Sequence, residues 1–112
     1  MAEKGRSGET AVREAPAGRL LKIKHEHREI GFLSARLVNE FSCPGAWCLR
    51  VESPESLDEF REHLAHGSSM LLTLFTHDGN IYRGEACVSS VSASADVASL
   101  VVLAGVGPLR ND

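Results

Sequence analysis

The chain has 112 residues, which is enough for one ordinary domain and too few for two. Hydrophobic residues make up 43% of it, and no apolar run approaches the roughly 20 residues that a membrane-spanning helix needs. We therefore expect no membrane partner. The net charge of −3 and the aromatic content of 5% argue against direct sequence-specific binding of nucleic acid, which needs a basic footprint or stacking rings.

The first part of the chain has the composition of an unstructured segment. Residues 1–18 are rich in Gly, Ala, Ser and Pro, carry charges of both signs and show no apolar period, so we predict a disordered arm. No apolar block of a signal peptide occurs there, and we therefore expect a cytoplasmic protein. A single domain is predicted over residues 19–112.

The domain begins with the pattern of a half-buried strand, in which Leu21, Ile23 and His25 alternate with lysines. A turn is expected at 28–31. Further strands are predicted from their apolar content and bounding turn residues at 32–38, 47–51, 70–76, 81–88 and 99–105. Between the predicted strands at 70–76 and 81–88, Asp78-Gly79 favours a tight hairpin.

One helix is predicted over about residues 54–66. Ser53 can cap it, and acidic residues in its first turn favour the positive end of the helix dipole. Strands, one helix and further strands together predict an α+β fold, mainly an antiparallel β sandwich or barrel with one α-helix. The expected core consists of Leu21, Ile23, Leu57, Phe60, Leu64, Leu72, Leu74, Val88, Leu100, Val102 and Leu103.

The cysteines and histidines are the candidate metal ligands. Three cysteines, an odd number, argue against a disulfide framework, and the spacing of Cys43 and Cys48 fits either a zinc pair or two small hydrophobic residues beside a turn. The histidines form two pairs, one expected on a single strand face and one on the helix. These residues are His25, His27, His63 and His66.

No recognised catalytic or metal-binding motif accompanies these residues. There is no Gly-x-Ser-x-Gly elbow, no His-Glu-x-x-His, and no helix after the closing glycines to receive a phosphate. We therefore assign no catalytic, cofactor-binding or metal-binding residue and expect neither a cofactor nor enzyme activity. A small β-barrel binding module that holds a metal through the His and Cys residues remains the alternative function.

The last third of the chain carries a distinctive order of features over residues 78–109. They are a strand with Gly84-Glu85-Ala86, a serine-rich stretch at 89–94, a turn at Asp96-Val97, an apolar strand at 100–103 and the ending Gly105–Leu109. This order resembles the closing region of tailed-phage major tail (tail tube) proteins, as does a helix before the hairpin. The chain is shorter than is usual for that family and lacks the aromatic residue of its last strand.

The resemblance implies a structural protein that self-assembles into rings or tubes through inter-subunit β-sheet contacts. It also implies a homo-oligomer, with other phage tail proteins as further partners, in a virion or tail-like particle after assembly. The small residues of 89–98 suit either close packing between subunits or a solvent-facing edge strand. The expected oligomer interface consists of Asp78, Gly79, Asn80, Ser89, Val91, Ala93, Asp96 and Val97.

Overall fold

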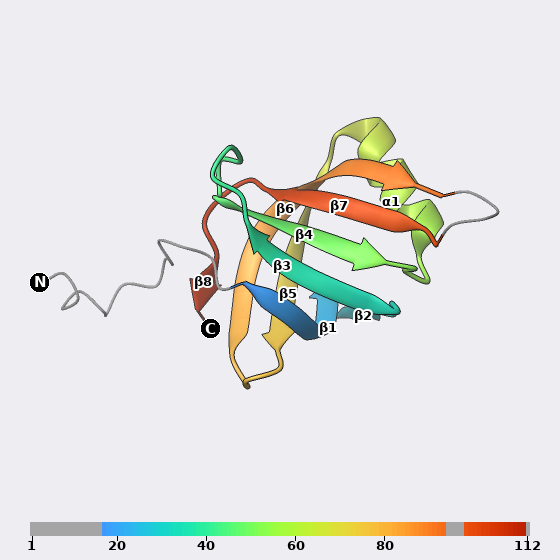
Figure 1. Ribbon diagram of the computed structural model, residues 1–112. Helices are drawn as coiled ribbons and strands as arrows, with labels where there is room; N and C mark the ends of the chain where they lie inside the picture. The colour runs from blue at the N-terminus through green and yellow to red at the C-terminus, as the bar shows by residue number, and fades with distance from the viewer. Residues whose placement is uncertain (1–16, 94–97, 112) are drawn as a thin grey trace, which may run out of the picture.

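The computed structural model describes residues 17–93 and 98–111, which form strands and one helix (Figure 1). The predicted arm falls outside this part of the chain, except that the first strand already begins at Gly18. The elements are β1 (Gly18–His25), β2 (Arg28–Ile30), β3 (Ser34–Asn39), β4 (Trp47–Glu52), α1 (Leu57–His66), β5 (Ser69–Thr76), β6 (Ile81–Ser92), β7 (Leu100–Gly105) and β8 (Arg110–Asn111).

Six of the strands close into an antiparallel barrel in the order β1–β3–β4–β7–β6–β5, with β5 pairing back onto β1. The short strands β2 and β8 add to β1 and β6. The helix α1 packs against β6 (Figure 1). This arrangement confirms the predicted α+β fold, in its barrel form. Closure matters because it pairs strand edges that would otherwise be open to other chains.

Trp47, the first residue of β4, is fully buried in the core. Its indole Nε1 donates a hydrogen bond of 2.7 Å to the carbonyl oxygen of Gly107. Two glycines inside neighbouring strands make room for the ring, because a Cβ at Gly105 would lie 2.6 Å from Trp47 Cδ1 and one at Gly84 would lie 2.9 Å from Cζ2. Any residue other than glycine at positions 84 and 105 would therefore place a side chain in the space that the indole occupies.

Four residues expected in the core lie outside it. Leu21 is 61% exposed, while its neighbour Leu20 is 4% exposed, because a β-bulge between Leu20 and Lys22 breaks the two-residue alternation of β1. Leu100 and Val102 are half-buried, since period two places Val101 and Leu103 inside the barrel. Leu64 is exposed, because only Phe60 of the helix is fully buried against the barrel.

The helix begins three residues later than expected. Ser53 has φ 50° and donates its backbone N–H to Ser99, while Glu55 donates to the carbonyl of Gly31, so this segment is tied to two other loops instead of a helical turn. Ser56 takes the N-cap position without a side-chain hydrogen bond. The other end is as predicted: Gly67 ends the helix in the left-handed conformation with φ 66°.

Candidate metal centre

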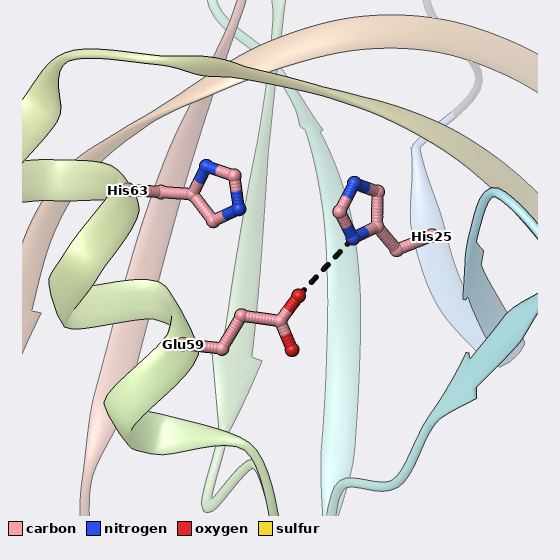
Figure 2. A group of neighbouring side chains, drawn as sticks. All are labelled: His25, Glu59 and His63. Carbon is pink, nitrogen blue, oxygen red and sulfur yellow. Dashed lines mark hydrogen bonds and ion pairs between the residues drawn. The ribbon is translucent and has the colours of Figure 1, made fainter.

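The end of β1 and one face of α1 bring three ligand-type side chains together (Figure 2). His25 is the last residue of β1, and Glu59 and His63 lie one helical turn apart on α1. Their ligand atoms all lie within 4.8 Å of one another. The sequence separates His25 from the helix pair by more than thirty residues, so only the fold creates this group.

The three side chains face a common space. His25 Nδ1 lies 3.2 Å from Glu59 Oε2, and the two imidazole rings meet edge to face with centroids 5.6 Å apart. His63 Nδ1 is 2.8 Å from the hydroxyl of Ser68, which leaves Nε2 as the nitrogen directed toward His25 in Figure 2. The His25 and Glu59 side chains are 15% and 22% exposed, so the site is partly shielded and open to small solutes.

A guanidinium shares the carboxylate of this site. Arg28 begins β2 directly opposite His25, and its Nη2 lies 2.6 Å from Glu59 Oε1 and 2.5 Å from Oε2. Burial raises the pKa of Glu59, but the hydrogen bonds and charges of Arg28 and then His25 outweigh it, so the pKa is below its ordinary value. The carboxylate is consequently ionised and available as a ligand at neutral pH.

The other two histidines lie away from the group. The chain turns at Glu26, which has φ 60°, and His27 is exposed in that turn, so the prediction that His25 and His27 share a strand face is wrong. The expected turn at 28–31 instead contains β2, which pairs back onto β1. His66 is exposed at the end of α1, where its Nδ1 donates 3.0 Å to the carbonyl of Glu62.

The cysteines join no group of three such ligands among residues 17–93 and 98–111. Cys48 and Cys87 both lie opposite Ala104 of β7, so one strand separates them by about 10 Å. Burial raises the pKa of the Cys48 thiol, Cys43 and Glu40 raise it further, and a nearby arginine opposes them. A raised pKa disfavours the thiolate form that binds metals, so Cys48 is a weaker candidate ligand than the clustered histidines.

The expected oligomer interface falls into two separate groups. Asp78, Gly79 and Asn80 are exposed at the tip of the β5–β6 hairpin, where Gly79 has φ 92°. Ser89 and Ala93 are exposed at the far end of β6, and Val91 packs partly against the core, while Asp96 and Val97 lie outside the described residues. The length of β6 therefore separates the two groups.

The sequence reasoning missed Glu59 as a ligand, although it placed both helical residues on the predicted helix. The signal was the spacing Glu59-x-x-x-His63, which sets both side chains on one helix face. Nothing local in the sequence places β1 beside that face.

Comparison with protein-family models, curated proteins and solved structures found no significant match. Within the described part of the chain, no helix is long and apolar enough to cross a membrane.

Proposed function

We propose that this chain is a small β-barrel binding module that holds a divalent transition-metal ion between β1 and α1. One observation carries the proposal: His25, Glu59 and His63 present ligand atoms within 4.8 Å of one another from two separate elements. Two imidazoles and one carboxylate are a donor set that suits Zn²⁺.

The distances fit a tetrahedral ion. Zinc bonds of about 2.0–2.2 Å place neighbouring ligand atoms about 3.3 Å apart, and His25 Nδ1 and Glu59 Oε2 are already 3.2 Å apart. His63 completes the set after a side-chain movement of roughly 1–2 Å, within the range of an ordinary rotamer adjustment. Ser68 at His63 Nδ1 provides the outer hydrogen bond that orients a ligating imidazole. The fourth position is left for water or a bound molecule.

Arg28 and the metal ion compete for the same carboxylate. The Arg28 side chain is 59% exposed, so it can withdraw into solvent when an ion takes its place. Binding is then an exchange of one cation for another at Glu59, and the arginine weakens the affinity of the site. Removing Arg28 should therefore strengthen metal binding. If Arg28 served only as a structural partner of Glu59, its removal would leave the metal affinity unchanged.

The test is isothermal titration of untagged, metal-free protein with Zn²⁺. We expect one ion per chain, a loss of affinity of at least about tenfold in His63→Ala and in Glu59→Gln, and tighter binding in Arg28→Gln. His66→Ala is the matched control, because this histidine lies on the same helix but faces Glu62. The absence of stoichiometric binding, or an equal loss in His66→Ala, would refute the proposal.

The second proposed function is self-assembly into rings or tubes like those of phage tail tubes, with copies of this chain and other phage tail proteins as partners. It is supported by the separation of the expected contacts at the two ends of β6, because a head-to-tail ring needs two different patches on each subunit. Exposed Leu33 and Phe41 provide further apolar surface for a neighbour to bury.

Light scattering at high protein concentration tests this second proposal. We expect a mass of several chains, reduced in Ser89→Arg at the expected interface and unchanged in Glu62→Arg on the exposed side of α1. A strictly monomeric protein at every concentration would rule the assembly out.

A further inference from the structure

Three arginines lie side by side on the outside of the barrel, across β1, β3 and β4. Arg19 lies directly opposite Arg36, and Arg36 lies directly opposite Arg50. All three are exposed. We refer to these three residues as the arginine row.

The arginine row is unfavourable in the free protein. Residues directly opposite in an antiparallel pair have Cβ atoms about 4.5–5.5 Å apart, and like charges at this distance destabilise the pair. Arg36 has such a neighbour on each side. No side chain of the described residues forms an ion pair or a hydrogen bond with the row. The strands thus gather positive charge that no side chain in 17–93 or 98–111 neutralises by an ion pair, in a chain whose net charge is −3.

The row borders a groove with the dimensions of a small-molecule site. Its volume is about 500 Å³, and its lining includes the hydroxyl-bearing residues Ser34 and Ser92. Glu52 is the one acid in the lining among the residues that the structure describes, and it accepts a hydrogen bond of 2.8 Å from Ser34 Oγ. Three guanidinium groups against one carboxylate leave the groove with an excess of positive charge.

The chemistry of the lining selects a compact polyanion. Guanidinium groups bind phosphate oxygens in pairs of parallel hydrogen bonds, and a row about 10 Å long offers one group to each of several linked phosphates. No aromatic residue is among the described residues that line the groove, so a nucleic-acid base finds no stacking partner among them. We propose that the arginine row is a binding site for a linear di- or triphosphate group.

This site is separate from the candidate metal centre. Arg19 lies near the start of β1 and His25 ends it, so about 20 Å of strand separates the two sites. Phosphate binding and metal binding can therefore be measured independently on the same protein.

The test uses tripolyphosphate in metal-free buffer at about 50 mM salt, followed by thermal unfolding and titration calorimetry. We expect tripolyphosphate to raise the Tm of the wild-type protein and to bind more tightly than orthophosphate or sulfate. Arg36→Gln should raise the Tm of the free protein by about 1–5 °C, because it removes two like-charge contacts. The same variant should lose about tenfold or more in affinity for tripolyphosphate.

The matched control is Arg61→Gln, which removes an exposed arginine from α1. It should bind tripolyphosphate as the wild type does. The proposal is overturned by a lack of saturable binding, by an equal loss in Arg61→Gln, or by equal binding of orthophosphate. A lower Tm of free Arg36→Gln would also overturn it, because Arg36 would then stabilise the barrel. Tighter, Arg36-dependent binding of a DNA duplex of about 20 base pairs would assign the row to nucleic acid instead.

Discussion

Replacing Gly105 by alanine measures how tightly the barrel is packed around Trp47. The added Cβ would lie 2.6 Å from Trp47 Cδ1, roughly 1 Å closer than carbon atoms pack at their optimum. The indole cannot avoid the contact by turning into solvent, because it is fully buried and its Nε1 is held by the carbonyl of Gly107. The ring must therefore shift, and the hydrogen bond must lengthen or break.

Two contributions set the expected loss of stability. Overpacking of a filled core costs about 1–3 kcal/mol, and loss of the indole hydrogen bond adds about 0.5–1.5 kcal/mol. We expect Gly105→Ala to lower the free energy of unfolding by about 2–4 kcal/mol and the Tm by about 8–25 °C. Urea unfolding followed by circular dichroism and by the fluorescence of Trp47, the single tryptophan, measures this change.

Gly107 provides the matched control. No atom lies within 4 Å of a Cβ built at this position, so Gly107→Ala should change the unfolding free energy by less than about 0.5 kcal/mol. In a Trp47→Phe background the smaller ring should reduce the effect of Gly105→Ala, since the two residues are in direct contact. A neutral Gly105→Ala, or an equal effect in both backgrounds, would refute the packing argument.

Two other predictions concern the helix contact and the bulge. The lowered pKa of Glu59 means that its ion pair with Arg28 stabilises the fold above the ordinary pKa of 4.5, and that this contribution is lost as the pH falls from there through the folded value. Glu59→Gln should therefore reduce stability by about 1–2 kcal/mol at pH 7 and flatten its acid dependence, whereas exposed Glu62→Gln should do neither in pH-dependent urea titrations. Leu20→Ala should destabilise by about 2–4 kcal/mol and Leu21→Ala by less than about 0.5 kcal/mol, and the reverse order in chemical unfolding would contradict the bulge in β1.

The class of the fold could be predicted because it depends on local sequence patterns, such as helix ends and hairpin turns. The helix end at Gly67 and the hairpin at Gly79 follow from local backbone requirements, and both were predicted. The turn differs in detail from the expected tight pair, because Gly79 has a positive φ and Asp78 does not. The bulge that exposes Leu21 depends on the pairing of β1 with β5, which the sequence of β1 alone does not contain. In β7 a continuous apolar run hides which residues face inward, so Leu100 and Val102 were misplaced.

The candidate metal centre likewise depends on contacts between segments far apart in the sequence, which local patterns do not reveal. Local spacing places Glu59 and His63 on one helix face, but it does not tell which strand end that face meets. The β1–β2 turn decides the matter, because it directs His25 toward the helix and leaves His27 in solvent. Residue types identify the possible ligands, but the three-dimensional path of the chain determines which of them lie together.

The seam between β1 and β5 has a consequence for how the protein folds. Its paired residues lie roughly 50 positions apart in the sequence, so the chain must spend the entropy of closing a long loop before this pairing forms. Until then β1 and β5 are unpaired edges, with Leu21 and Leu71 exposed beside them. During this time the open edge of β1 can pair with β5 of another copy of the chain, and the open edge of β5 can pair with β1 of another copy. The time needed to close the seam, compared with the interval between molecular encounters, therefore determines whether the barrel completes itself or exchanges a strand with a neighbour.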